Sequence, residues 1–301
     1  MALDDQVLEP WIAWTLLAAA LQSVRTAAQK QLNKDISAEG ATLVRYLFGL
    51  PFALLYLAVL TRGIEMPRVG LVFVLAVLSA GFLQILATVL LVRLFKLRNF
   101  AVGSTYVRAE ILVTAILGVF LFSDWVSPLG WLAILVCASG LLLVNLTGSG
   151  RWGGLFSQSA AYGLTASIAF SLTSLLIREA SLSINIDSAV IAAAMTLAAM
   201  VCIQTVMSLL LVVVRNSSEL GLIMHHWRPS LFIGITGIIG SIGWFTAFTL
   251  ERAAYVKTLG QVEFFISLLI SYYFFKERPS RREWIGMLLL VLGVILLLAS
   301  D

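Results

Sequence analysis

The sequence predicts an all-α integral membrane protein with ten transmembrane helices arranged as two inverted five-helix repeats. Three observations predict this fold class. The chain of 301 residues is 60% hydrophobic and only 12% charged, with a mean hydropathy of +0.98, whereas soluble domains are about one quarter charged. Separate apolar stretches of membrane-spanning length follow one another along the chain. The second half of the sequence also repeats features of the first half.

A spanning helix needs about 20 mostly apolar residues. Ten stretches meet this requirement: residues 11–29, 41–60, 70–92, 100–122, 127–146, 157–177, 188–214, 229–250, 253–275 and 283–300. All ten are expected to be helices, because lipid offers the backbone no hydrogen-bond partners and the alternating pattern of a barrel is absent. The first stretch follows acidic residues and no cleavage motif, so we expect a retained helix and not a signal peptide.

An internal repeat organises these helices. A shift of 153 residues aligns Ala101–Val144 with Ala254–Leu297 without a gap, and nine of the 44 pairs are identical. The pairing of Glu110 with Glu263 carries particular weight, because acidic residues are rare inside membranes. A looser match at a shift of 148 pairs Ser23 with Ser171 and Lys30 with Arg178.

We therefore expect two five-helix domains, residues 1–150 and 151–301. Since five is an odd number, the second domain must enter the membrane upside down relative to the first. Inverted repeats are typical of secondary transporters, whose binding sites lie near the midplane between the repeats.

The charges of the connecting loops predict an orientation. The connections after spans 1, 3, 5, 7 and 9 hold 12 Lys and Arg residues, and those after spans 2, 4, 6 and 8 hold four. Basic loops stay in the cytoplasm, so the charges place both termini outside it.

Two basic side chains inside the spans are candidates for a substrate site. Charged groups within a membrane are costly and usually face a cavity or a partner. Helical spacing places Arg108 on one face with Ser104 and Thr105, and Lys257 on one face with Thr258 and Gln261. The repeat relates these two faces, so they are expected to line one cavity that suits a carboxylate; a structural ion pair is the alternative.

Other polar residues of the spans join this prediction. Gln84 and Ser23 could donate hydrogen bonds to a ligand or to a neighbouring helix, and Trp244 could form an apolar wall. Glu110 and Glu263 lie two residues beyond Arg108 and Gln261, which places them near the opposite helix face. They are expected either to hold helices together, against Arg25 or Arg45, or to carry a coupled proton.

No motif indicates an enzyme, a cofactor or a metal site. Cys137 and Cys202 lie within apolar stretches and are interpreted as packing residues, and His225 and His226 have no companion ligands. The net charge of +4 is explained by the basic loops and does not indicate nucleic-acid binding. Gly234, Gly237, Gly240 and Gly243 predict close helix packing.

The ends of the two halves carry a resemblance. In the first half, Phe122-x-Asp124 is followed by Trp131, and in the second half, Phe275-x-Glu277 is followed by Trp284. Each Trp belongs to a predicted helix that contains a glycine. The chain thus resembles EamA-type domains of the drug/metabolite transporter superfamily, in two tandem copies, and looks most like the YddG-type exporters of aromatic and other amino acids. It departs from the pattern by Asp124 in place of Glu, and by the lack of a proline near Glu110 and Glu263.

This resemblance implies an exporter of the bacterial inner membrane that works by alternating access, with amino acids as substrates and the bilayer as surroundings. A monomer is expected, because both repeats lie in one chain. Related proteins are often drawn with both termini in the cytoplasm, opposite to the orientation from loop charges. A drug or nucleoside-like metabolite exporter of the same superfamily, or a passive channel, is the alternative.

Overall fold

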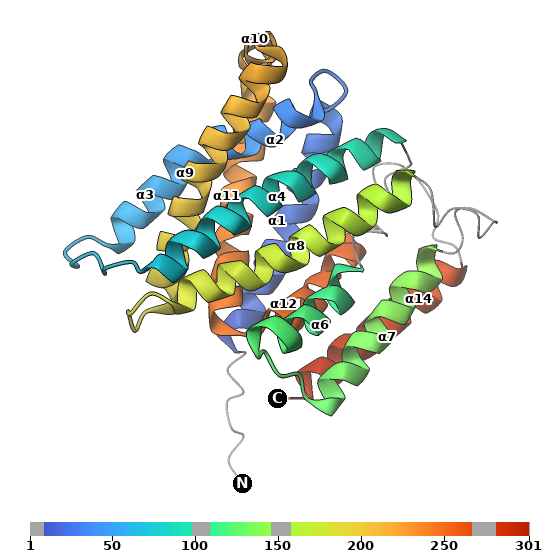
Figure 1. Cartoon of the computed structure of the whole chain (residues 1–301). Helices are drawn as coiled ribbons and strands as arrows, with labels where there is room; N and C mark the ends of the chain where they lie inside the picture. Colours follow the sequence, from blue (N-terminus) through green and yellow to red (C-terminus); the bar gives the residue numbers. More distant parts are fainter. Residues whose placement is uncertain (1–8, 98–108, 146–157, 267–280, 301) are drawn as a thin grey trace.

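The computed structural model describes residues 9–97, 109–145, 158–266 and 281–300, and every regular element within these ranges is a helix (Figure 1). In chain order the helices are α1 (Pro10–Leu32), α2 (Ala38–Leu47), α3 (Leu50–Leu60), α4 (Leu71–Leu97), α6 (Glu110–Phe122), α7 (Pro128–Asn145), α8 (Gln158–Leu182), α9 (Ala189–Asn216), α10 (Glu219–His225), α11 (Trp227–Leu250), α12 (Ala253–Leu259), the 3₁₀ helix η2 (Gly260–Val262) and α14 (Arg281–Leu298). The predicted all-α class is confirmed for this part of the chain.

Five helical segments of the described residues are long and apolar enough to cross a membrane: Ala38–Leu60, Leu71–Leu94, Ala161–Leu182, Ala189–Asn216 and Trp227–Leu250. Shorter apolar helices lie at Glu110–Phe122, Pro128–Gly140 and Trp284–Leu298. The prediction of ten spans is thus met in part. The predicted fourth and ninth spans extend into residues 98–108 and 267–280, and the predicted domain boundary at residue 150 also lies outside the described residues.

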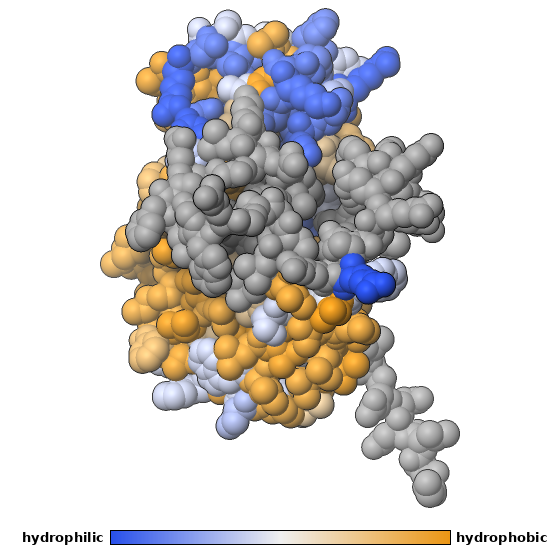
Figure 2. Space-filling model, turned by 90° about the vertical axis from the view of Figure 1, so that its right-hand side faces the viewer, coloured by the Kyte–Doolittle hydropathy of each residue, from blue (hydrophilic) through white to orange (hydrophobic). Residues whose placement is uncertain are grey.

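The surface agrees with a multi-pass membrane protein. Figure 2 shows hydrophilic residues gathered at the end of the molecule that carries α10, and hydrophobic residues over the lower part. Large apolar side chains such as Val59, Phe120 and Val214 are 65%, 81% and 83% exposed. Soluble monomers rarely expose extensive apolar surface, so these side chains are suited to contact lipid.

The most extensive helix pairings join the first half of the chain to the second. α1 packs on α11, α4 packs on α8, and α7 packs on α14. These are the first, third and fifth predicted spans with the eighth, sixth and tenth. Exchanging the two halves turns the α1–α11 pair into the α8–α4 pair and turns the α7–α14 pair into itself. The packing therefore has the two-fold relation expected of two repeats.

The crossing of α7 and α14 shows this relation at the level of atoms. A Cβ added to Gly140 would lie 2.8 Å from the carbonyl oxygen of Gly286, and one added to Gly293 would lie 3.0 Å from that of Ala133. Both pairs are related by the shift of 153 residues. Buried Cys137 packs at the same crossing, as a packing residue would.

The glycines of α11 allow a similar approach to α1. A Cβ on Gly243 would lie 2.7 Å from the carbonyl oxygen of Trp14, and one on Gly237 would lie 3.4 Å from Cδ of Arg25. Since the contact on α1 moves toward its C-terminus as that on α11 moves toward its N-terminus, the two helices are antiparallel. The predicted close packing of this glycine-rich helix is confirmed.

Two membrane helices are interrupted, and a basic residue stands next to each interruption. α2 ends at Leu47, with Arg45 in its last turn, and α3 begins beside Pro51, which supplies no backbone N–H to continue a helix. α12 ends at Leu259, with Lys257 in its last turn. The C-terminal end of a helix carries partial negative charge, so both interruptions stabilise a cation inside the protein.

Candidate functional site

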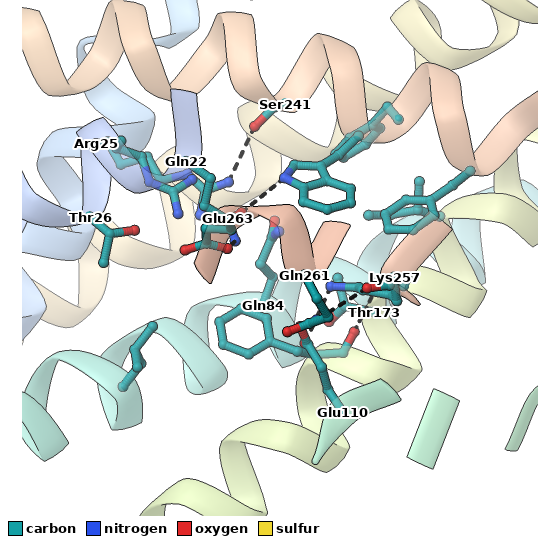
Figure 3. A pocket seen from close by; sticks show the side chains of 18 residues that line it. Gln22, Arg25, Thr26, Gln84, Glu110, Thr173, Ser241, Lys257, Gln261 and Glu263 are labelled. Carbon is teal, nitrogen blue, oxygen red and sulfur yellow. Dashed lines mark hydrogen bonds and ion pairs between the residues drawn. The ribbon is translucent and has the colours of Figure 1, made fainter. Parts of the chain in front are cut away.

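A polar cavity lies between the two halves of the chain. The cavity has a water-accessible volume of about 90 Å³. Its walls come from α1, α2, α4, α6, α8, α11, α12 and η2, and Figure 3 shows its lining side chains. The lining residues are Gln22, Arg25, Thr26, Arg45, Gln84, Leu91, Glu110, Phe170, Thr173, Ser174, Ile177, Ser241, Trp244, Phe245, Phe248, Lys257, Gln261 and Glu263.

An ion pair between the two halves crosses the cavity. Nζ of Lys257 on α12 lies 3.2 Å from Oε2 of Glu110 on α6, and the two side chains are 10% and 13% exposed. The same Nζ lies 5.2, 5.6 and 6.0 Å from the ring centres of Trp244, Phe248 and Phe170. Aromatic rings attract a cation through their faces, so Lys257 is held by one carboxylate and three rings.

A chain of hydrogen bonds forms the opposite side of the cavity. Nε1 of Trp244 donates to Oε1 of Gln22 at 2.9 Å, and Nε2 of Gln22 donates to Oε2 of Glu263 at 2.8 Å. In Figure 3, Gln22, Arg25 and Glu263 lie together on one side, and Lys257, Gln261 and Glu110 on the other. The cavity therefore has two polar groups of residues, each containing a carboxylate and at least one cation.

Arg25 and Arg45 belong to the first of these groups. They are 7% and 6% exposed, and NH2 of Arg45 donates to Oγ of Ser241 at 3.2 Å. The guanidinium of Arg45 also lies 5.3 Å from the ring centre of Tyr46. Arg25 is repelled by the charge of Arg45 and attracted by that of Glu263.

Cavity amides are fixed by further contacts. Oε1 of Gln84 accepts a hydrogen bond from Nε2 of Gln204 at 2.7 Å, and Nε2 of Gln261 donates to the carbonyl oxygen of Lys257 at 3.1 Å. A carboxamide has one oxygen acceptor and two N–H donors, so the bonding capacity of the Gln84 amide exceeds this one contact. The arrangement can thus hold a small molecule that carries both charges and hydrogen-bonding groups.

The structure brings most of the predicted site residues together. Lys257, Gln261, Gln84 and Trp244 line the cavity, and so do Glu110 and Glu263. Ser23 does not: its hydroxyl is buried and lies within hydrogen-bonding distance of the carbonyl oxygens of Ala19, at 3.1 Å, and Glu263, at 3.4 Å. Arg108 lies outside the described residues.

Ser23 has an equivalent contact in the other half. Oγ of Ser171 donates to the carbonyl oxygen of Glu110 at 3.0 Å, and the repeat relates Ser171 to Ser23 and Glu110 to Glu263. Each serine therefore fixes the backbone next to a cavity carboxylate of the opposite half. Here the looser sequence match at a shift of 148 has a direct structural counterpart.

The expected direction of Glu263 is corrected by the structure. Glu263 was expected near the face opposite Gln261, yet both line the cavity. The 3₁₀ turn Gly260–Val262 separates Lys257 from Glu263. A 3₁₀ helix turns by about 120° per residue and an α-helix by about 100°. With three residues of the 3₁₀ type, the angle between Lys257 and Glu263 around the helix axis becomes about 60°, whereas a regular α-helix would give about 120°.

Several lining residues were not among the predicted site residues, above all Arg45, Phe170, Thr173 and Phe248. Arg25 and Arg45 were considered as partners for the carboxylates and were not among the predicted binding residues. The position of Arg25 three residues after Gln22 on α1 is a signal that both share one face. The rings of Phe170 and Phe248 gave no such signal, because aromatic residues are common throughout this sequence.

The fold and this cavity define a multi-pass helical membrane protein with a charged cavity between two related halves, an arrangement typical of secondary transporters. The model of the EamA-like transporter family matches residues 9–146 and, a second time, residues 158–299. The chain therefore belongs to the EamA-like transporter family, within the drug/metabolite transporter superfamily, and carries its domain twice. Proteins of this family are generally transporters and not enzymes.

A solved structure supports the fold. A crystal structure described only as that of a protein aligns with a TM-score of 0.68 and 17% sequence identity, over 96% of this chain and 97% of the other. At this identity the likeness concerns the fold alone. A search of curated proteins finds no match.

Proposed function

We propose that this transporter exports amino acids across the bacterial inner membrane by alternating access, with broad selectivity. The family gives the class of protein, and the cavity supports the choice of substrate. It contains cations, carboxylates, amides and aromatic rings within one small volume. An amino acid carries the complementary set: a carboxylate, an ammonium group and a side chain of variable polarity.

The ion pair between Lys257 and Glu110 is the observation that carries this proposal. An amino acid can replace the pair group by group, because its carboxylate can bind Lys257 while its ammonium group binds Glu110. Both protein charges then remain paired. An unpaired charge buried inside a membrane protein would be costly. The side chain of the amino acid would lie against Trp244, Phe248 and Phe170.

Replacement of this pair also offers a route to movement. The pair joins α6 of the first half to α12 of the second half. When substrate takes over both partners, this ion pair between the halves is lost, so binding changes the relative stability of the two conformations required for alternating access. A single chain contains both halves, so we propose that a monomer suffices.

Other predicted residues have roles in this proposal. Gln84 and Gln261 would hydrogen-bond the substrate, and Arg108, related by the repeat to Gln261, would add a further cation. Glu263 would either hold Gln22 in place or carry a coupled proton. We keep the loop-charge orientation, with both termini outside the cytoplasm, as a proposal.

Counterflow of radiolabelled amino acids in proteoliposomes tests the function. We expect saturable exchange for the wild type and a loss of at least tenfold in Lys257→Ala, because the substrate carboxylate loses its cation. Lys34→Ala, which removes an exposed lysine outside the cavity, is the matched control and should exchange normally.

Other results would point elsewhere. Non-saturating flux without counterflow would show a passive channel. Saturable exchange of nucleoside-like or drug-like molecules, but of no amino acid, would keep the transporter and replace its substrate. Full exchange in Lys257→Ala would contradict the role of the ion pair.

A further inference from the structure

Two buried arginines stand side by side at one end of the cavity. A Cβ added to Gly237 would lie 3.3 Å from Cγ of Arg45 and 3.4 Å from Cδ of Arg25, so both side chains pass over the same glycine. Both are more than nine-tenths buried. Guanidinium groups stay protonated in proteins, and two like charges so close in a poorly solvated place repel each other strongly.

Protein groups balance only part of this charge. Arg45 has the hydroxyl of Ser241, the ring of Tyr46 and the C-terminal end of α2. Glu263 attracts Arg25, but one of its oxygens already accepts a hydrogen bond from Gln22.

Arg25 also has a donor without a partner. Its Nε is buried and makes no hydrogen bond within the described part of the chain, although Arg25 lines the cavity. Buried polar groups are nearly always paired, and an exception calls for a missing partner. By contrast, the ammonium group of Lys257 already has Glu110. The incompletely satisfied cationic group of the described cavity is thus the arginine pair.

The charge of the cavity points the same way. Its described lining residues include three cations, Arg25, Arg45 and Lys257, and two carboxylates, Glu110 and Glu263. One positive charge is left over. A zwitterion does not balance it, whereas an amino acid with an acidic side chain carries one net negative charge.

We propose that Arg25 and Arg45 form an anion-binding subsite that receives a carboxylate of the transported molecule, and that amino acids with acidic side chains are the preferred substrates. The side-chain carboxylate binds between the two guanidiniums, which can present paired N–H donors to its oxygens. The α-carboxylate and ammonium group bind Lys257 and Glu110. This inference rests on the proposed function, because it assigns a second part of the same cavity.

A comparison of an acidic with a neutral amino acid as the transported substrate tests the subsite. Half-saturation concentrations for counterflow of aspartate and leucine are measured for the wild type, Arg25→Gln, Arg25→Lys and the control Arg68→Gln, which removes an exposed arginine. We expect aspartate to half-saturate the wild type at a concentration at least tenfold lower than leucine. Arg25→Gln should abolish this preference, Arg25→Lys should retain part of it, and Arg68→Gln should retain all of it.

Calorimetric binding of aspartate and succinate to the purified protein in detergent separates the inference from the proposed function. If the wild type exchanges no amino acid but binds succinate, and Arg25→Gln does not bind it, the function is wrong and the anion subsite stands for a dicarboxylate. If amino acids exchange without acidic preference and Arg25→Gln matches the wild type, the function stands and the subsite is overturned. Should Arg25→Gln fail to fold, the same measurements on Arg25→Lys and Arg45→Gln decide between these outcomes.

Discussion

The ion pair between Lys257 and Glu110 should show strong energetic coupling in a double-mutant cycle. At 3.2 Å and an effective dielectric constant of about 20, the attraction of two unit charges is about 5 kcal/mol. Burial costs both partners part of their hydration, so the net value of the pair is smaller. Removing one partner, however, leaves the other buried without its opposite charge, which costs about 3–5 kcal/mol.

We therefore expect Lys257→Met and Glu110→Gln each to lower the free energy of unfolding by about 3 kcal/mol or more. The double variant should be less destabilised than the sum by at least about 2 kcal/mol, because it removes both charges of the pair together. The assay is SDS-induced unfolding in mixed micelles, followed by circular dichroism. Lys34→Met, at an exposed position, is the control and should change stability by less than about 0.5 kcal/mol.

Additive effects of the two replacements would refute this reasoning. They would mean that the two charges do not interact in the folded protein, and that a substrate has no ion pair to replace. A destabilisation by Lys257→Met alone would instead assign the main role to the aromatic rings around the ammonium group.

Two further predictions concern the packing of α7 on α14 and the connection at residues 123–127. In Gly293→Ala the new methyl group would clash with Sγ of Cys137 and would lie 3.0 Å from the carbonyl oxygen of Ala133, so we expect a loss of about 1–3 kcal/mol in the same titration. Gly221→Ala, with nothing within 4 Å of its Cβ, should change stability by less than about 1 kcal/mol. Equal effects would contradict the close crossing of α7 and α14. Arg178 pairs with Asp124 at 3.4 Å and donates to two backbone carbonyl oxygens near the end of α11, so Arg178→Gln should speed hydrogen exchange in residues 123–127 about tenfold or more. Unchanged exchange would show that Arg178 does not hold this connection.

Hydropathy predicted the long apolar helices of the described residues, and helical spacing with the repeat predicted much of the cavity lining. Lys257 and Gln261 share a face by spacing, and the repeat pointed to a cavity between the halves. These features are local or periodic, so they are visible in one sequence. α1 was predicted as a span, but it is not among the five helical segments apolar enough to cross a membrane, and its residues Gln22, Arg25 and Thr26 line the cavity.

The partners across the cavity could not be predicted in the same way. Glu110 was assigned a direction from its own helix, but its partner Lys257 lies 147 residues away on a helix of the other half. Spacing within one helix does not reveal which helix stands opposite. The 3₁₀ turn that brings Glu263 to the cavity is likewise invisible to a reading that assumes 100° per residue throughout.

The pairing of α1 with α11, α4 with α8 and α7 with α14 has a consequence for biosynthesis. When the ribosome has released only the first half of the chain, the helices that will cover α1, α4 and α7 do not yet exist. The early chain must wait in the lipid with its principal contact surfaces unpaired, and Arg25 and Glu110 lack their later neighbours. Maturation is therefore a late event that depends on insertion of the second half, and two separately translated halves should be able to find each other in the same membrane.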